Sequence, residues 1–472
     1  MAGRFLNLFK PVARVLPEIK APERRVRFNE KLFWTALVLI IYLIMSEIWL
    51  VGIPPGTRQE LAPLAIIFAS ARGKLTELGI GPIVTAGLVL QLLVGSQMID
   101  CDMSKPDDRS LFTSANKVFA ILLTGVQAAA YIIGGMYNTP EGGGLTGTTS
   151  ILVFLQLIAS GVIIMLMDEL VQKGWGFGSG ISLFIMAGVA QHIFWQMFNP
   201  STGLFVGGLT ALLTSTSSNA LNTWIVGTGT YPSLVGFIAT IIAFLIIIYM
   251  EGVRVELPLS YAGYRGFRSR YPIKLLYVSN LPVIFAFALF ANVYLFSQIF
   301  WGLYNPHNSN FWFNLLGQFQ IVGNTPTPIG GLAYYVTAPH GITDVTAHPD
   351  KAFGYLGILV VFCIIFSLTW LEVGGLGPST VAKQLVDSGM QIPGYRRSDK
   401  AVESILKRYI PTVTVLGGVI VGLLAGITDF FGVFGSGMGI LLSVGIIYQY
   451  YEILMQERAT EMFPAFRRIL GE

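Results

Sequence analysis

Long apolar segments alternate with shorter polar ones along the whole chain of 472 residues. A bilayer core about 30 Å thick needs roughly 20 predominantly apolar residues for one helical span. Ten segments meet this requirement, and membrane helices are predicted at 32–51, 80–99, 116–136, 150–171, 180–198, 233–253, 278–301, 353–373, 409–428 and 434–455. The pattern therefore predicts an integral membrane protein with ten transmembrane helices.

The composition agrees with this interpretation. Hydrophobic residues make up 53% of the chain and charged residues only 12%, and a mean hydropathy of +0.65 exceeds what the cores of soluble domains require. Cys101 and Cys363 lie far apart, so neither a disulfide framework nor a cysteine metal site is expected. Residues 1–31 are basic and lack the apolar core of a cleavable signal peptide. The first span is therefore expected to remain in the mature protein.

The distribution of lysine and arginine predicts the orientation of the chain, because these residues are retained on the cytoplasmic side during insertion. With the N-terminus inside, the cytoplasmic segments hold 26 of the 30 basic residues. The outer side keeps only Arg58, Arg72, Lys74 and Lys351. Both termini are therefore expected in the cytoplasm. Before the first span, one helical face carries Phe5, Leu8, Phe9, Val12, Val15 and Leu16, which predicts an amphipathic helix along the cytoplasmic surface.

A short apolar segment between the first two spans is too short to cross the membrane. It begins at Arg58 and reads RQELAPLAIIFASARGKLTEL, with apolar side chains at helical spacing. Segments of 12 to 14 apolar residues are usually re-entrant, interfacial or buried. Two interpretations remain open, namely a helix on the outer surface and a short helix folded into a cavity between the spans.

The two halves of the chain share a motif. Phe-Gly-Ser-Gly opens the fifth span at 177–180 and the tenth at 434–437, and the predicted topology places these two starts on opposite sides of the membrane. Two inverted halves of five spans build a pathway at their interface. Ionisable residues lie near the span ends, which disfavours a secondary transporter. No HExxH-type spacing or P-loop occurs, so neither an intramembrane protease nor a nucleotide hydrolase is expected.

Five stretches resemble the SecY family, the α-subunit of the Sec protein-conducting channel, on its archaeal and eukaryotic side. They are LGIGPIVTAG from Leu78, YPIKLLYVSNLPV from Tyr271, ALFAN from Ala288, GGLAYYV from Gly330 and LKRYIP from Leu406. The resemblance implies an all-α fold of ten transmembrane helices in two inverted five-helix halves around an hourglass pore. The expected parts are a cytoplasmic N-terminal segment (1–31), an N-terminal half (32–198) with a plug helix at about 59–70, an outer loop (199–232), a C-terminal half (233–455) with cytoplasmic loops at about 254–277 and 374–408, and a cytoplasmic tail (456–472).

The resemblance also implies roles for single residues. The pore ring would be Ile80, Val84, Ile181, Ile185, Ile284 and Leu442. The lateral gate would contain Thr85, Gln127 and Asn292, and the plug would present Leu61, Leu64, Ile67 and Phe68. A ribosome or another driving partner would dock on Arg265, Arg268, Arg270, Lys274, Arg396 and Arg397. Aromatic residues interleave with these cations, as in nucleic-acid contacts, although the positive-inside rule alone would also explain the charges.

The function implied is that of the central subunit of the Sec translocon. It would conduct unfolded secretory polypeptides passively and release hydrophobic segments into lipid through a lateral gate. Expected partners are small single-span γ-type (SecE-like) and β-type subunits, a ribosome touched through its rRNA, a nascent chain with a signal sequence, and membrane lipids. No enzymatic activity, metal or cofactor is expected. A secondary transporter and an insertase without a through-pore remain the alternatives, and an archaeal plasma membrane and the endoplasmic reticulum both fit.

Overall fold

The computed structural model describes most of the chain. The described residues are 9, 11–12, 16–53, 73–95, 98–99, 101, 106–134, 137, 145–200, 202–214, 224–227, 232–261, 268–276, 281–322, 325–339, 341–388, 390–391 and 399–462. The plug residues Leu61, Leu64, Ile67 and Phe68 lie outside these ranges, as do Arg265, Arg396 and Arg397.

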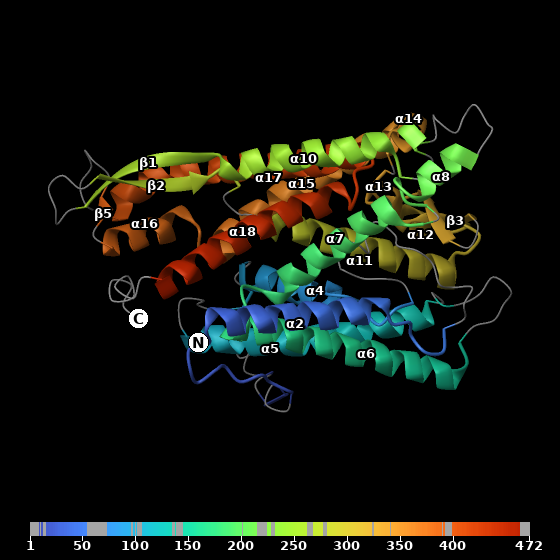
Figure 1. Ribbon diagram of the computed structural model, residues 1–472, viewed down its shortest axis with the longest axis horizontal. Coiled ribbons are helices and arrows are strands. Elements are labelled where there is room, and N and C mark those ends of the chain that lie inside the picture. Colours follow the sequence, from blue (N-terminus) through green and yellow to red (C-terminus); the bar gives the residue numbers. More distant parts are fainter. Residues whose placement is uncertain are drawn as a thin grey trace.

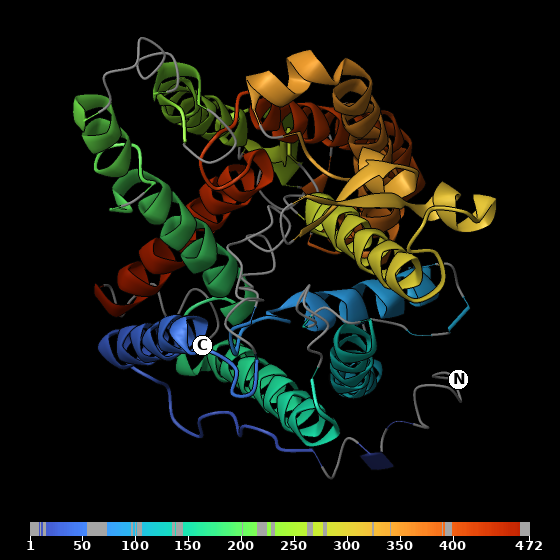
Figure 2. The same cartoon turned by 90° about the vertical axis from the view of Figure 1, so that its right-hand side faces the viewer.

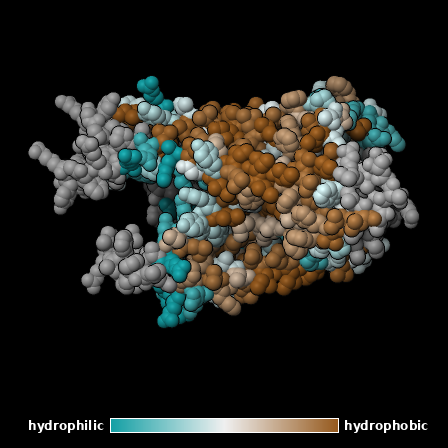
Figure 3. Space-filling model, turned by 45° about the horizontal axis from the view of Figure 1, so that its top comes forward, coloured by the Kyte–Doolittle hydropathy of each residue, from teal (hydrophilic) through white to brown (hydrophobic). Residues whose placement is uncertain are grey.

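Nine helices of the described residues are long and apolar enough to cross a membrane. They are α2 (Phe28–Glu47), α5 (Pro106–Ile133), α6 (Gly147–Leu170), α7 (Gly180–Phe198), α10 (Leu234–Gly252), α11 (Leu281–Tyr304), α15 (Pro349–Val373), α17 (Asp399–Phe430) and α18 (Gly437–Met462), and α6 continues into a π-helical turn, η2 (Val171–Trp175). A tenth apolar helix, α4 (Gly81–Gly95), has only 15 residues, which is shorter than the predicted span 80–99. The helices run along the long axis in Figure 1, and a broad apolar band crosses the face shown in Figure 3.

The helices form two groups that correspond to the two halves of the sequence. In the first group α4 packs on α5, α5 on α6, and α7 on both α6 and α2. In the second group α15 packs on α11 and α17, and α18 packs on α10 and α17. Figure 2, an end-on view, shows the blue-to-teal helices of the first group on one side and the yellow-to-red helices on the other. The groups meet along two seams, where α4 contacts α11 and α15, and where α18 contacts α7 and α2.

The loops contain β-structure, so the predicted all-α fold is wrong in this detail. An antiparallel hairpin of β1 (Arg254–Tyr261) and β2 (Arg268–Lys274) pairs with β5 (Met390–Gln391) in the order β2-β1-β5. A second hairpin joins β3 (Gln318–Val322) to β4 (Thr325–Gly330). Shorter helices also lie in the loops of the described part of the chain, among them α8 (Gly207–Thr214), α12 (Phe311–Leu316), α13 (Leu332–Tyr335), α14 (Ile342–Ala347) and α16 (Pro378–Asp387).

These loop elements gather at the two ends of the molecule. β1, β2, β5 and α16 lie at one end, and α8, α12, α13 and α14 lie at the other (Figure 1). The first set belongs to the loops predicted to be cytoplasmic and the second to the loops predicted to be outside. We therefore call them the cytoplasmic end and the outer end.

The two copies of the Phe-Gly-Ser-Gly motif share the geometry of their glycines but not of their serine, since Ser179 is extended with φ of −121° and Ser436 has φ of +64°. The first glycine of the motif is in the left-handed region, with φ of +66° at Gly178 and +78° at Gly435, a conformation that favours glycine. Its second glycine starts the next helix, and a Cβ there would clash with the preceding helix, at Asp168 for Gly180 and at Ala425 for Gly437. The motif thus makes a close-packed turn into a helix twice, with a different backbone conformation at its serine.

A carboxylate from the preceding helix caps the helix that follows each of these turns. The Ile181 N–H donates to Asp168 Oδ1 at 2.9 Å, and the Gly437 N–H donates to Asp429 Oδ1 at 2.6 Å. The first N–H groups of a helix lack an intrahelical acceptor, so these carboxylates satisfy donors that burial would otherwise leave unpaired. Tyr355 donates to the second oxygen of Asp429 at 2.9 Å.

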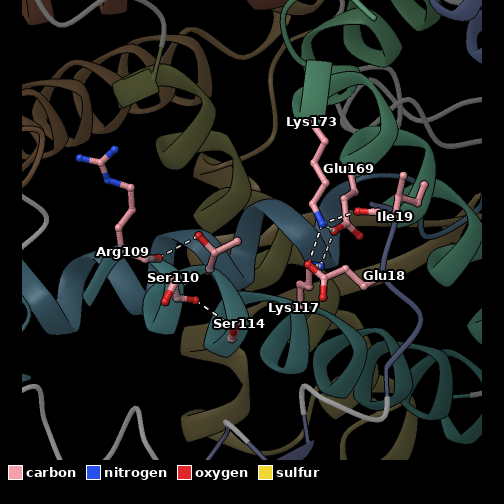
Figure 4. Close-up of polar contacts among 9 residues, drawn as sticks. Glu18, Ile19, Arg109, Ser110, Ser114, Lys117, Glu169 and Lys173 are labelled. Carbon is pink, nitrogen blue, oxygen red and sulfur yellow. Dashed lines mark hydrogen bonds and ion pairs between the residues drawn. The ribbon is translucent and has the colours of Figure 1, made fainter. Parts of the chain in front are cut away.

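The N-terminal segment lies across the cytoplasmic ends of α5 and α6 (Figure 4). Lys173 Nζ contacts Glu18 Oε1 at 2.6 Å and also donates to the carbonyl of Ile19. Buried Glu169 accepts from Lys117 at 2.5 Å and pairs with Lys173 at 2.8 Å. Of the predicted amphipathic helix, Phe9 packs on Phe119 with a centroid distance of 5.1 Å; most of its other residues lie outside the described ranges.

Replacing Glu18 with glutamine should loosen this segment. The hydrogen bond from Lys173, assisted by the charge of Lys117, lowers the pKa of Glu18 from its usual 4.5. A carboxyl with a lowered pKa contributes its pairing fully above the usual value and loses it as the pH falls through the lowered one. The pairing is therefore complete at neutral pH, and since Glu18 is largely exposed, its loss should cost at most about 1 kcal/mol.

Limited trypsinolysis between Lys20 and Arg25 measures this effect. We expect cleavage of the Glu18→Gln chain to be faster than that of the wild type at pH 7. The matched control is Glu23→Gln, which removes the same charge from an exposed position on the same segment. Equal acceleration by both substitutions would contradict a specific contact at Glu18.

Candidate functional site

The aliphatic residues predicted to line the waist come from both halves of the molecule. They are Ile80, Val84, Ile181, Ile185, Ile284 and Leu442, and all belong to or pack against one apolar cluster. Ile80 directly precedes α4, and the other five lie in the first two turns of α4, α7, α11 and α18. Ile80, Ile185 and Leu442 are at most 1% exposed. Branched apolar side chains offer water and ions no hydrogen bond, and a narrow passage that they line dewets.

A polar cluster bridges the seam between α4, α5 and α11. Asn292 Nδ2 on α11 donates to Thr85 Oγ1 on α4 at 3.2 Å and to the Ala288 carbonyl on its own helix at 2.7 Å. Gln127 Nε2 on α5 donates to Asn292 Oδ1 at 3.3 Å. The structure therefore brings together the three residues that the sequence places at the lateral gate, with Asn292 between the other two.

The rest of this seam is mostly apolar and contains a small cavity. The cavity has a volume of about 10 Å³ and is lined by Leu88, Gln91, Leu92, Phe285, Phe366, Thr369 and Trp370. These residues come from α4, α11 and α15. Among the described residues Gln91 Oε1 has no hydrogen-bond partner although it is buried. The cavity has room for about one water molecule beside this unpaired oxygen.

The opposite seam is more strongly held. Tyr450 on α18 lies with its hydroxyl 2.8 Å from the Ser179 carbonyl and 3.0 Å from that of Phe177, which are residues of the first repeated turn. Gln196 on α7 accepts from the Gly435 N–H of the second turn at 3.1 Å. A Lys31–Glu457 ion pair of 2.5 Å adds a charged contact between α2 and α18.

The contacts in the opposite seam were not predicted from the sequence. A tyrosine and a glutamine inside apolar spans are a weak signal, because a single polar residue in a span can serve a local packing contact. Their reciprocal arrangement follows from the antiparallel packing of α7 on α18, which the repeated motif alone does not reveal. The seam at Asn292 thus consists of neutral, longer hydrogen bonds, whereas the seam at Tyr450 has shorter bonds and an ion pair.

The two ends of the predicted plug region are held side by side at the outer end of α2. Leu50 N donates to the Gly73 carbonyl at 2.8 Å, and Leu75 N donates to the Ile48 carbonyl at 2.9 Å. Gly73 has φ of +78°, and a Cβ there would press on Trp49 at 3.2 Å, so glycine fits this position.

A buried carboxylate secures the second end of this region. Glu77 Oε2 accepts from the Tyr137 hydroxyl at 2.6 Å and from the Gly73 N–H at 3.1 Å. Lys74 pairs with Glu47 at 2.8 Å and stands 5.4 Å from the Trp49 ring centroid. The residues that flank the segment 54–72 on both sides are therefore held at one fixed position beside the outer end of α2.

The predicted docking cations differ in their surroundings. Arg270 on β2 is 76% exposed and pairs with Glu256 at 2.5 Å, and this hydrogen bond lowers the pKa of Glu256. Lys274 lies 3.4 Å from Glu452 and 5.0 Å from the Tyr448 ring centroid, so it fixes the base of the hairpin to α18. The backbone of Arg268 on β2 lies opposite that of Ser260 on β1 in the antiparallel register.

Comparison with known proteins relates this arrangement to a family. A family model for SecY matches residues 74–451, and a model for the plug domain of Sec61p matches residues 40–73. The protein translocase subunit SecY of Pyrococcus horikoshii is 41% identical over 466 residues, 96% of each chain. That of Pyrococcus furiosus is 40% identical over 478 residues, covering 98% of this chain and 99% of the relative.

Solved structures agree. One described as the structure of a protein conducting channel has a TM-score of 0.81 and 37% identity, covering 97% of this chain and 98% of the other. Sec61 in the canine ribosome-channel complex from the endoplasmic reticulum has a TM-score of 0.79 and 36% identity over the same shares. The chain therefore belongs to the SecY family, whose members are subunits of a protein-conducting channel and not enzymes.

Proposed function

We propose that this subunit conducts unfolded polypeptides through the waist and releases apolar segments sideways between α4 and α5 on one side and α11 and α15 on the other. The observation that carries the proposal is the bridge from Asn292 to Thr85 and Gln127. It joins the two halves at a seam whose other side chains around the small cavity are mostly apolar.

The strength of this bridge suits a gate. Interhelical polar contacts in membranes average only about 0.6 kcal/mol, and each central leucine or phenylalanine of a signal sequence gains about 0.3 to 0.6 kcal/mol on entering lipid. A segment with several such residues would therefore outweigh the bridge. The seam at Tyr450, with its ion pair and shorter hydrogen bonds, would stay closed and act as the axis of opening.

The ring of six aliphatic residues would seal the idle channel, and residues 59–70 would plug its outer side. Support for the plug comes from the family model over residues 40–73 and from the clamp at Gly73 and Glu77. A clamp of this kind would keep both ends of the plug segment attached beside α2 while the plug itself moved out of the pore.

The driving force would come from a partner on the cytoplasmic loops. Two similar structures are ribosome-bound channels, the canine Sec61 complex and the yeast Ssh1 complex at 25% identity and a TM-score of 0.74. On this basis we propose a ribosome bound through Arg265, Arg268, Arg270, Arg396 and Arg397. Lys274 would brace the hairpin rather than contact the partner. Small γ-type and β-type subunits, ten spans and cytoplasmic termini complete the proposal, in an archaeal plasma membrane or the endoplasmic reticulum.

Single-channel conductance in a planar bilayer tests this function. The wild type and a chain lacking residues 59–70 are reconstituted with the small partner subunits. We expect few openings from the wild type and frequent large currents from the deletion variant, because only the aliphatic ring would then close the pore. Silence from both chains, with correct folding and insertion shown separately, would contradict a plugged aqueous pore and favour a transporter without one.

A further inference from the structure

A group of large apolar side chains is exposed at the outer end, beside the seam helix α11. On α12, Phe311 is 72% exposed, Trp312 74% and Leu315 63%. Exposed apolar side chains also occur on α11, β3 and α13, which pack against α12, and on β4, which packs against α13; they are Phe300, Leu303, Tyr304, Ile321, Ile329 and Leu332. Exposed apolar side chains gathered on neighbouring elements mark contact with a membrane or a protein.

α12 folds back alongside the end of α11. Phe313 stacks on Tyr304 with a centroid distance of 5.8 Å and an interplanar angle of 10°, and it lies 6.1 Å from Phe300. Phe300 and Tyr304, the two residues that Phe313 contacts, lie four residues apart and thus about 6 Å apart along the axis of α11. α12 therefore lies level with the last turn of this 24-residue membrane helix. This is the depth at which the hydrocarbon gives way to the headgroups.

Asparagine side chains hold the connecting loop in this position. Asn305, which is 1% exposed, donates to Asn314 Oδ1 at 2.8 Å and accepts from the Asn310 N–H at 3.0 Å. Asn314 donates to the Asn308 carbonyl at 2.9 Å, and Asn308 donates to the Phe319 carbonyl at 3.1 Å. Irregular backbone near lipid must satisfy its polar groups internally. Neutral side chains of this network satisfy the Asn310 N–H and the carbonyls of Asn308 and Phe319, while Asn308 Oδ1 is buried without a partner among the described residues.

The sequence around α12 also lacks charge. From the end of α11 at Tyr304 to Asp344, residues 305–343 contain no Asp, Glu, Lys or Arg, although charged residues form 12% of the whole chain. A loop surrounded by water, or one that binds a charged partner, would not need to avoid charge over such a length. Tryptophan, tyrosine and phenylalanine without charges are typical of the membrane interface.

We infer that α12, together with the β3–β4 hairpin, lies in the interfacial layer of the outer leaflet and anchors the end of α11 there. The ligand is the lipid boundary itself, recognised through apolar and aromatic contact and not through headgroup charge. Because α11 carries Asn292, this anchor fixes the depth of the helix that forms one side of the seam. The inference needs only that the chain spans a membrane, so it stands apart from the conduction of polypeptides.

A nitroxide spin label at position 315 tests the inference. Leu315→Cys is made in a Cys101→Ser background, and the full chain is reconstituted in phosphatidylcholine vesicles at low protein density. Collision with oxygen, which concentrates in lipid, is compared with collision with a water-soluble nickel chelate. Thr343→Cys on α14 is the water-exposed control, and Val361→Cys on α15, a 53% exposed position of a membrane helix, is the lipid reference.

We expect the oxygen-to-nickel ratio at Leu315 to lie well above that at Thr343 and to approach that at Val361. A ratio equal to that at Thr343 would overturn the inference, because α12 would then stand in water. Low access to both reagents would overturn it as well, since the surface would be covered by protein, such as a second copy of this chain. Translocation activity is a separate measurement and decides nothing about this result.

Discussion

A disulfide between positions 85 and 292 should stop translocation almost completely, and a reductant should restore it. Asn292 Nδ2 and Thr85 Oγ1 are 3.2 Å apart, so the two side chains meet across the seam. Cysteines there are joined by oxidation or, where the Cβ atoms stand farther apart than the roughly 3.5–4.5 Å of a disulfide, by a short bis-methanethiosulfonate linker that a reductant also cleaves. A covalent bond cannot yield to a signal sequence, whereas the native contact of about 0.6 kcal/mol can. The measurement is the fraction of a secretory precursor protected inside vesicles, before and after reduction, with Thr85→Cys and Asn292→Cys in a Cys101→Ser background.

The control for this experiment is a disulfide across the other seam. Val189 and Gly439 face each other between α7 and α18, where a Cβ at 439 would lie 3.0 Å from Val189 Cγ2. If this seam is the axis, Val189→Cys with Gly439→Cys should leave most of the translocation intact in the oxidised state. Full activity of the oxidised 85–292 pair, or equal inhibition by both pairs, would contradict a gate at Asn292.

Replacing Asp429 with alanine should cause the largest loss of stability. Its two oxygens accept from the Gly437 N–H at 2.6 Å and from the Tyr355 hydroxyl at 2.9 Å, and all three groups lie inside the molecule. Each buried donor left unpaired costs about 1 to 3 kcal/mol. Thermal unfolding in detergent should therefore begin several degrees lower for Asp429→Ala than for the wild type.

Two further variants separate the contributions at this position. Tyr355→Phe removes one hydrogen bond and leaves the cap on Gly437, so its melting temperature should fall less. Asp168→Ala removes the corresponding cap from α7, where Ile181 N donates, and should also destabilise the protein. A wild-type melting temperature for Asp429→Ala would show that the cap contributes little to stability.

Much of the membrane architecture follows from hydropathy, because each span must satisfy its backbone internally as a helix. The predicted span 180–198 coincides with α7, and most other predicted spans differ from the helices by a few residues. α5 and α17 are the exceptions, because they begin at Pro106 and Asp399, well before the predicted spans 116–136 and 409–428. Hydropathy measures how well a segment tolerates lipid and does not detect a helix that continues through charged residues beyond the membrane core.

The polar residues of the seam were predictable only through the resemblance. Hydropathy treats Thr85, Gln127 and Asn292 as three separate weak interruptions, and no local pattern brings residues 85 and 292 together. Their contact depends on the packing of α4 against α11, which is a property of the whole fold. The same applies to Tyr450 and Gln196, whose partners are backbone groups of distant turns.

The β-structure at the cytoplasmic end has a different origin. The segment 254–274 contains Pro258 and Pro272, which would interrupt a helix. Its two parts instead pair as the antiparallel strands β1 and β2. The short β5 strand then pairs with the hairpin edge from more than a hundred residues away. Such pairing over a long sequence distance leaves no local signal.

This pairing joins the two cytoplasmic loops into one mechanical unit. Ser260 and Tyr261 on β1 pair with Gln391 and Met390 on β5, and the connected helices α10, α11, α16 and α17 all belong to the C-terminal half. A load applied to either loop is therefore shared by both and is carried into one half of the molecule alone. A partner bound to this sheet would immobilise the C-terminal half. Opening of the seam at Asn292 would then be a rotation of the N-terminal half relative to it.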